Sequence, residues 1–289
     1  MILNIMIILK LFSRLPMWLL YIFSDIMFVV VYYLTGYRKQ VVITNIRNSF
    51  PDMPGDEVKV IAKEFYRRFM DFTMETLKAF TITEEELIKR VKFTNLPDVQ
   101  PYADRHQSIL VIASHQFNWE WALLTGCIVL PFPVDAVYQK LSSNSFNDLM
   151  LKTRSRFGGQ PVEKSNILRV VLKSRERLRA LGIVADQSPR RKSQKYWTNF
   201  LNQETAFFLG PEQIAKVAKY PTFFFKVNRV KRGYYTVELV KLTEPPYEKA
   251  DHSILEAYAK ATEALVIEDP AGYLWSHKRW KLRKEEEID

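Results

Sequence analysis

A long apolar stretch near the N-terminus is the strongest feature of the hydrophobic pattern. Residues 15–36 contain Asp25 as their only charged residue, and they are long enough to cross a bilayer core, which takes about 20 apolar residues. A charge near the middle makes full insertion costlier. Aromatic side chains of the kind found at membrane interfaces occur along the stretch, and two basic residues follow it directly: Trp18, Tyr21, Tyr32, Tyr33, Tyr37, Arg38 and Lys39.

These features predict a hydrophobic membrane anchor over residues 1–37. The basic residues after the stretch favour a cytoplasmic location for the rest of the chain, because cytoplasmic flanks carry an excess of Lys and Arg. The pattern fits both a spanning helix and a half-inserted anchor. A helical hairpin buried in a soluble core is the competing interpretation. A cleaved signal peptide fits poorly, because no small-residue cleavage site is evident.

Helical and β-type patterns share the remainder of the chain. Apolar residues recur at helical spacing over residues 56–80, which predicts a helix. Short apolar runs predict strands at 91–94, 109–113, 134–138, 182–185, 222–230 and 234–240. The last two runs flank Lys231, Arg232 and Gly233 and indicate an antiparallel hairpin. Strands that alternate with helices predict an α/β domain over residues 38–289, with a mixed, mostly parallel sheet flanked by helices.

Composition excludes several classes of protein. Hydrophobic residues make up 47% of the 289 residues, which is too many for a disordered chain. The single cysteine, Cys127, cannot form an internal disulfide, so a disulfide scaffold is excluded. Four histidines and one cysteine leave little for a structural zinc site.

The positive charge is concentrated in one segment. Residues 152–195 hold thirteen basic and three acidic residues, which accounts for the whole net charge of +10. Such a segment indicates an anionic partner: nucleic acid, an anionic membrane, a phosphorylated lipid or an acidic carrier protein. A solvated helix face is the simpler interpretation. No motif of a nucleic-acid-binding module is present in the sequence.

Candidate chemistry follows the second predicted strand. The strand at 109–113 runs through a turn into a helical pattern, and His115 and Glu120 stand five residues apart across that turn. On one continuous helix this spacing separates side chains by about 140°, so they meet only if His115 lies in the turn and Glu120 in the first helical turn. We therefore expect His115 to act as a general base whose imidazole Glu120 orients. The alternatives are a structural histidine, or Ser114 as a nucleophile, although no G-x-S-x-G elbow surrounds it.

At these residues the sequence resembles a known family. His-x4-Glu after a buried strand is the hallmark of the lysophospholipid acyltransferase superfamily. The fuller string from His115 through Asn118 and Trp119 to Glu120 resembles the bacterial lipid A late acyltransferases, the lauroyl/myristoyl transferase family. Further segments are similar to that family's blocks, in the same order along most of the chain: Asn45 to Pro51, Asp186 to Pro189, Thr205, Gly210 to Glu212, and Tyr273 to Lys281.

The resemblance implies an α/β acyltransferase with an N-terminal anchor in the bacterial inner membrane. It implies transfer of a fatty acyl chain from a thioester, on acyl carrier protein or acyl-coenzyme A, to a hydroxyl of a lipid such as a lipid A precursor. No metal or redox cofactor is implied. The catalytic domain is expected on the cytoplasmic side of the membrane. With His115 and Glu120 as catalytic residues, the candidate substrate-binding residues are Asn118, Lys140, Arg154, Arg156, Asp186, Gln187, His277 and Arg279.

Two departures from the family pattern bear on the acceptor. Gln139 and Lys140 stand where the family usually has a basic residue and proline, and Asn202 stands where it usually has glycine. The same chemistry on an amino-acid lipid, a lysophospholipid or another glycolipid therefore stays open. A thioesterase and a non-catalytic lipid-binding protein are further alternatives.

Overall fold

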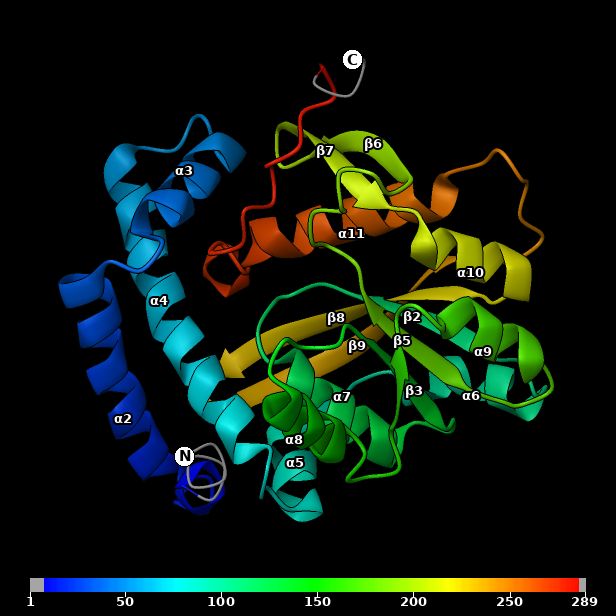
Figure 1. The fold of residues 1–289 in the computed structure, drawn as a ribbon, viewed down its shortest axis with the longest axis horizontal. Coiled ribbons are helices and arrows are strands. Elements are labelled where there is room, and N and C mark those ends of the chain that lie inside the picture. The colour runs from blue at the N-terminus through cyan, green and yellow to red at the C-terminus, as the bar shows by residue number, and fades with distance from the viewer. Residues whose placement is uncertain (1–7, 286–289) are drawn as a thin grey trace.

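The computed structural model describes residues 8–285, and a seven-stranded sheet forms its centre (Figure 1). The strand order is β1-β9-β8-β2-β5-β3-β4. Every neighbouring pair is parallel except β8 and β9, which form the predicted antiparallel hairpin. The prediction of a mostly parallel, mixed sheet is therefore confirmed. The strands of this sheet are β1 (Val91–Phe93), β2 (Ile109–Ala113), β3 (Val134–Tyr138), β4 (Gln160–Glu163), β5 (Ala180–Val184), β8 (Thr222–Lys231) and β9 (Tyr234–Thr243).

Helices cover both faces of the sheet and pack at one end of it. The main helices are α2 (Met17–Val29), α3 (Lys39–Ser49), α4 (Gly55–Lys78), α5 (Glu84–Arg90), α6 (Leu96–Asp104), α7 (Trp119–Val129), α8 (Asn144–Arg154), α9 (Ile167–Lys173), α10 (Gly210–Ala218) and α11 (Ser253–Glu268). A separate two-stranded ribbon consists of β6 (Lys195–Phe200) and β7 (Gln203–Phe208).

Alternation along the buried central strand β2 assigns the core to two layers. Leu110 and Ile112 belong to the apolar cluster that contains α9, α10, α11 and the β6–β7 ribbon. Ile109, Val111 and Ala113 belong to the cluster beneath α5, α6 and α7. Because successive side chains of a strand point to opposite faces, one fully buried strand supports both layers.

Some strands were not predicted from the sequence. Strand β4 lies at the sheet edge and contains Pro161, a residue that is tolerated mainly on edge strands. The residues of β6 are mostly half-exposed, and no continuous apolar run or clear alternation distinguishes them. The central strands gave stronger signals because burial on both faces requires apolar residues at every position.

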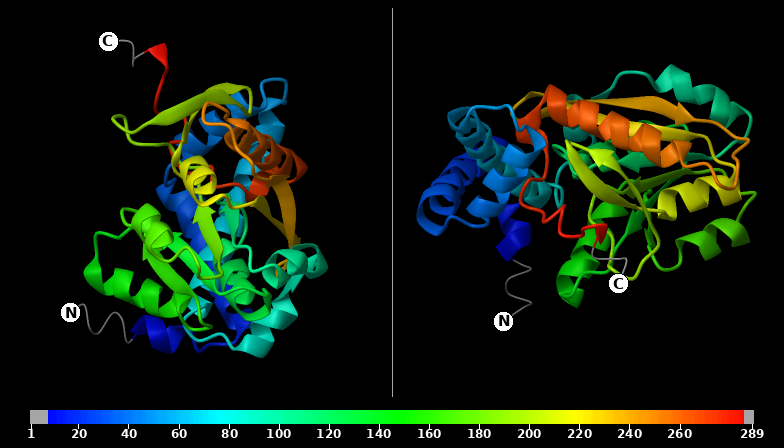
Figure 2. Two further views of the ribbon diagram at one scale, coloured as in Figure 1. Left: turned by 90° about the vertical axis from the view of Figure 1, so that its right-hand side faces the viewer. Right: turned by 90° about the horizontal axis from the view of Figure 1, so that it is seen from above.

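The predicted anchor forms helix α2, which continues as a short π-helix (Val30–Thr35). Helix α2 does not project from the molecule but lies beside α4 (Figures 1 and 2). Its buried side chains, Met17, Leu20, Ser24 and Phe28, recur at helical spacing and form the face that packs inward. Residues 1–7 of the predicted anchor lie outside the described residues.

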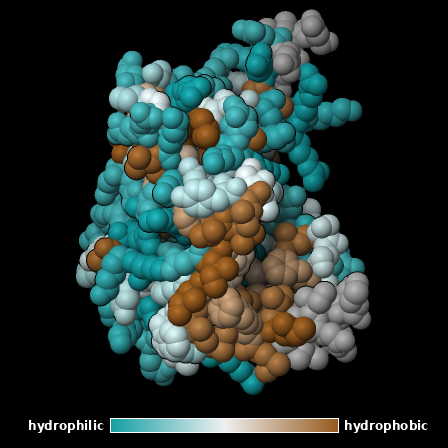
Figure 3. Space-filling model, turned by 90° about the vertical axis from the view of Figure 1, so that its left-hand side faces the viewer, coloured by the Kyte–Doolittle hydropathy of each residue, from teal (hydrophilic) through white to brown (hydrophobic). Residues whose placement is uncertain are grey.

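The other face of this helical segment is apolar and exposed. Figure 3 shows hydrophobic side chains gathered on the side of the molecule where α2 lies. The exposed apolar residues recur at about one position or one adjacent pair per helical turn along the segment: Trp18, Ile22, Ile26, Val29, Val30, Tyr33 and Leu34. A contiguous apolar surface of this kind is typical of contact with a membrane or another apolar partner.

Candidate active site

The candidate site lies where two neighbouring parallel strands end. Strand β2 leads into His115, and strand β5, its hydrogen-bonded neighbour, leads into Asp186. The register pairs Ala113 with Val184, so the two residues beyond the strand ends meet at the same edge of the sheet. Crevices at the carboxyl ends of parallel strands are the usual location of ligand sites in α/β proteins.

Asp186 holds His115 through two hydrogen bonds. One carboxylate oxygen accepts the His115 backbone N–H at 2.9 Å, and the other contacts the ring Nδ1 at 2.6 Å. Because an ionised carboxylate only accepts, the proton of the neutral imidazole lies on Nδ1, and Nε2 keeps its lone pair. A side-chain amide N–H of Gln187 lies 3.3 Å from Nε2. The ring is thus arranged to accept a proton at Nε2.

The surroundings keep Asp186 ionised. Burial acts to raise the pKa of its carboxyl, but His115 and the nearby guanidinium of Arg279 outweigh burial and lower that pKa. Arg279 is itself buried, with its guanidinium 4.6 Å from the ring centroid of Phe207. A buried positive charge behind a carboxylate stabilises the anion that orients His115.

The structure corrects the expected partner of His115. Glu120 does lie in the first turn of α7, but its two carboxylate oxygens bind Arg154 of α8, with one N–O distance of 3.0 Å. This pair raises the pKa of Arg154 despite its burial. The helical turn directs Glu120 toward α8, so the group that contacts the imidazole is Asp186, which is distant in sequence and adjacent in the sheet.

The loop before α7 is tied to the C-terminal segment. The His115 carbonyl accepts the Leu274 N–H at 3.1 Å, and the Phe117 N–H donates to Gly272 at 3.1 Å. Phe117 has a positive φ of 54°, a conformation that is uncommon for a side chain of this size. These bonds hold the loop so that His115 stands at the sheet edge.

The motifs that resembled the family come together around this segment. Asn45 donates to the carbonyls of Trp275 and His277, at 2.8 and 3.0 Å. The indole N–H of Trp280 donates to Thr205 at 2.7 Å. Blocks that are spread over more than 200 residues of the sequence thus make hydrogen bonds with the C-terminal segment that contacts the His115 loop. Glu212 is an exception, since it binds Lys216 and His252 instead.

A large cavity opens beside His115. Its volume is about 1120 Å³, somewhat above the roughly 300–1,000 Å³ of most small-molecule pockets. The cavity lies between the sheet and helices α7 and α8. Its apolar lining includes Val111, Ala113, Ala122, Leu123, Leu130, Val134, Ala136, Met150, Leu151, Ala180 and Phe225. Such a lining suits a flexible hydrocarbon chain.

The candidate residues divide into two groups. Six of them line the cavity: His115, Glu120, Lys140, Arg154, Gln187 and His277. Burial lowers the pKa of His277 to about 4, so its ring is neutral at pH 7. Lys140 is exposed, while Arg154 lies in the wall. The others lie behind or away from the lining.

Those other candidates make contacts within the protein. Asp186 and Arg279 are buried behind His115. Asn118 caps helix α7, accepting the Trp121 N–H at 2.9 Å. Arg156 donates to the carbonyls of Ala79 and Ile82, each at 2.6 Å. These bonds explain Asn118 and Arg156 structurally, and a role of either in substrate binding stays a prediction.

Ser114 and the residue types that bind metals are the remaining features to place. The Ser114 hydroxyl is buried, and no hydrogen-bond partner for it exists among residues 8–285, so nothing there activates it as a nucleophile. Within the same residues, no group of three or more His, Cys, Asp or Glu side chains is placed to hold a metal ion.

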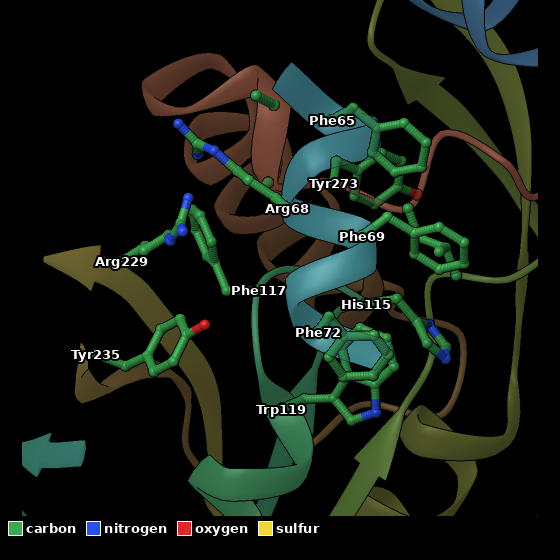
Figure 4. A pocket seen from close by; sticks show the side chains of 13 residues that line it. Phe65, Arg68, Phe69, Phe72, His115, Phe117, Trp119, Arg229, Tyr235 and Tyr273 are labelled. Atoms are coloured by element: carbon green, nitrogen blue, oxygen red, sulfur yellow. The ribbon is translucent and has the colours of Figure 1, made fainter. Parts of the chain in front are cut away.

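Aromatic side chains of α4 lie close to the imidazole (Figure 4). Phe65, Phe69 and Phe72 line a small pocket that also contacts His115. Trp119 packs against both neighbours, with ring centroids 4.2 Å from Phe72 and 4.8 Å from His115. The imidazole therefore lies beside aromatic rings at the margin of the large cavity, whose lining also includes Phe72 and Trp119.

Comparison with known families assigns the chain. The family model of the bacterial lipid A biosynthesis acyltransferases matches residues 2–282. The chain belongs to this family. The match covers nearly the whole sequence, and it makes the protein an acyltransferase. A search of curated proteins found no match. Membership of the family implies an acyl donor and a lipid acceptor, to which the cavity and the His115 edge can now be related.

Proposed function

We propose that this acyltransferase moves a fatty acyl chain from a thioester to a hydroxyl of a lipid A precursor. The donor is acyl carrier protein or acyl-coenzyme A, and His115 is the general base. The observation that carries the proposal is the position of His115: Nε2 keeps its lone pair, and the residue lines an apolar cavity of about 1120 Å³. Lysophospholipids, amino-acid lipids and other glycolipids remain the alternative acceptors.

The proposed reaction needs only groups of this chain. Nε2 of His115 accepts the proton of the acceptor hydroxyl while its oxygen attacks the thioester carbonyl. The tetrahedral intermediate collapses with loss of the thiolate, which takes the proton from the imidazolium and leaves as a thiol. Asp186 stabilises the imidazolium during this cycle, because its carboxylate faces Nδ1 at 2.6 Å.

The cations on the cavity lining complete the proposed site. Glu120 holds the Arg154 guanidinium in place through Nε and one Nη, so its remaining N–H groups are preorganised to donate to an anionic group of a substrate or to the oxyanion of the intermediate. Lys140, exposed on the same lining, suits a phosphate of the acceptor. Glu120 thereby acts through Arg154 in this scheme.

We further propose that the protein attaches to the inner membrane, with its catalytic domain on the cytoplasmic side, and that α2 is half-inserted. Three polar contacts hold α2 along the domain: Tyr21 to Glu75, Ser24 to Asp71, and Asp25 to Arg232, each at 2.7 Å. A helix crossing the bilayer in this arrangement would take the charged residues of α4 and of the β8–β9 hairpin into hydrocarbon, at a high cost. An in-plane helix inserts only its exposed apolar face.

Two experiments test these proposals. A strain that lacks this protein should make lipid A without one acyl chain, as measured by mass spectrometry, and the wild-type gene should restore the chain. Unchanged lipid A together with an altered phospholipid or amino-acid lipid would move the proposal to that acceptor.

The second experiment tests membrane attachment. Replacing Trp18, Ile22 and Ile26 by Ser should release the protein from vesicles. Recovery of the full-length wild-type protein in the soluble fraction without detergent would contradict attachment.

A further inference from the structure

A carboxylate that the reaction does not use lies buried between α2, α4 and α7. Glu75 of α4 is fully buried and accepts three hydrogen bonds. Tyr21 of α2 donates to one oxygen at 2.7 Å, and Asn118 and Tyr235 donate to the other at 2.7 and 2.6 Å. Figure 4 shows Tyr235 extending from its strand toward α4.

The environment of Glu75 is unusual for a carboxylate. No cation forms a salt bridge with it within residues 8–285, so hydrogen bonds alone compensate its burial. Burial raises the pKa of Glu75, while the donors from Tyr235, Tyr21 and Asn118 oppose that shift. An ionisable group at such a position is costly for stability, and an apolar side chain would fill the space at lower cost. Its presence therefore indicates a role beyond packing.

Glu75 determines which way the Asn118 amide points. The amide nitrogen donates to Glu75, so the amide oxygen faces the other way and accepts the Trp121 N–H at 2.9 Å. This bond caps the N-terminus of α7. The backbone carbonyl of Glu75 also accepts the indole N–H of Trp121 at 2.8 Å. Residue 75 thus fixes the start of α7 from two directions.

The start of α7 bears on the reacting groups. Asn118 follows the loop of His115, Gln116 and Phe117. Glu120, which binds Arg154 of α8, lies in the first turn of α7 directly after it. The cap bond therefore lies between the His115 loop and the Glu120–Arg154 ion pair, both of which line the cavity. A misplacement of about 1 Å at such a site can cost roughly 10²-fold in rate.

The third hydrogen bond comes from the helix that faces the membrane. Tyr21 lies on α2, between the exposed residues Trp18 and Ile22. We propose that Glu75 is a positioning residue that couples the seating of α2 on α4 to the geometry of the His115 loop. The proposal rests on the membrane attachment and acyl transfer proposed above. Seating of α2 against a lipid surface then favours the aligned loop.

Two substitutions in α2 form a matched pair that tests this coupling. Tyr21→Phe removes the hydroxyl that reaches Glu75. Ser24→Ala removes a hydroxyl with the same 2.7 Å bond to α4, but to Asp71, which does not contact Asn118. With purified full-length protein on vesicles of anionic phospholipid, we expect Tyr21→Phe to lower kcat about tenfold with an unchanged KM for the donor. Ser24→Ala should stay within about twofold of wild type.

A double-mutant cycle tests the path through Asn118. Glu75→Gln and Asn118→Ser should each lower kcat, and the double variant should be little worse than the more severe single one, because both break one connection. Additive losses, or equal losses in Tyr21→Phe and Ser24→Ala, would overturn the coupling. If Glu75→Gln does not fold, the Tyr21→Phe and Ser24→Ala comparison still decides.

Amide hydrogen exchange separates this proposal from the proposed function. Tyr21→Phe should speed exchange at the amides of residues 115–122, and Ser24→Ala should not. If the wild-type protein transfers no acyl chain to any acceptor, the proposed function fails, while the exchange data still decide whether Glu75 couples α2 to the loop. Unchanged exchange at those amides in Tyr21→Phe would refute the coupling.

Discussion

At the residue scale, the proposed reaction depends on the tautomer of His115. Asp186→Asn keeps the size of the side chain but presents an amide, which donates to Nδ1 as readily as it accepts. A donor at that position stabilises the tautomer with its proton on Nε2, and the base is lost. We expect kcat to fall about 10²–10⁴-fold, as measured by steady-state acyl transfer.

Glu120→Gln is the comparison for Asp186→Asn. This change loosens Arg154 but leaves the Nδ1 contact intact, so the acidic limb of the pH–rate profile should keep its position. Asp186→Asn should abolish or shift that limb. A shifted acidic limb in Glu120→Gln, with an unchanged limb in Asp186→Asn, would identify Glu120 as the residue that orients the imidazole.

His277 predicts how stability depends on pH. Burial lowers its pKa from 6.5 to about 4, so between these values the unfolded chain binds more protons than the folded one. Stability therefore falls as the pH falls through this window. Thermal unfolding of wild type and His277→Gln should show a smaller loss between pH 7 and pH 5 in the variant. Equal losses of stability in the wild type and the variant would mean that the His277 ring is exposed to solvent in the folded protein.

The sequence located His115 but not its partner. The strand–turn–helix pattern predicted His115 at a strand end, and the five-residue separation from His115 predicted Glu120 as its partner. Asp186 was singled out only as a substrate-binding candidate, because strand order is not visible in one sequence, and the β2–β5 pairing is what joins residues 115 and 186. Glu75 gave no signal, since it reads as one more polar residue on an amphipathic helix.

At the element scale, strand β5 offers a way to test what the cavity holds. Gly182 lies on the cavity wall, and a Cβ added there would meet only the Asp135 carbonyl oxygen, at 3.7 Å, an ordinary contact. Gly182→Ala should therefore preserve activity. Gly182→Leu should fill part of the cavity and shift the preference toward shorter acyl chains, measured as kcat/KM across donors of increasing length. An unchanged preference would place the acyl chain elsewhere.

Elements with strong apolar patterns were predictable and those shaped by tertiary contacts were not. The runs at 109–113 and 134–138 match β2 and β3 to the residue. The apolar stretch of α2 predicted a membrane helix. Its packing on α4 also includes hydrogen bonds from Tyr21 and Ser24, which a hydropathy average along the sequence does not reveal. Partners distant in sequence determine how such a helix lies.

At the scale of the whole molecule, the positive charge of residues 152–195 is partly neutralised inside the fold. Arg154 pairs with Glu120, and Arg177 and Arg179 both pair with Asp135. The segment is therefore not a uniform basic surface. Three basic residues of the segment are exposed at or near the cavity. Arg190 is part of the cavity lining, and Arg191 and Lys192 follow it in the sequence.

Charge reversal near the cavity should weaken docking of an anionic substrate. We expect Arg191→Glu with Lys192→Glu to raise the KM for donor or acceptor at low salt and to flatten its salt dependence, with kcat little changed. Lys89→Glu with Lys260→Glu makes the same change in net charge outside the segment and serves as the control. Equal KM values in both double variants would make the segment a solvated face.

The most direct measurement of the central claim is the mass of the acceptor after reaction. Purified protein is incubated with acyl-carrier-protein or acyl-coenzyme A donor and a lipid A precursor, and the lipid is analysed by mass spectrometry. The account predicts a product heavier by the mass of one fatty acid less one water, absent or reduced at least about 10²-fold with His115→Ala of native fold. Release of free fatty acid with an unmodified acceptor, or wild-type turnover by His115→Ala, would contradict it.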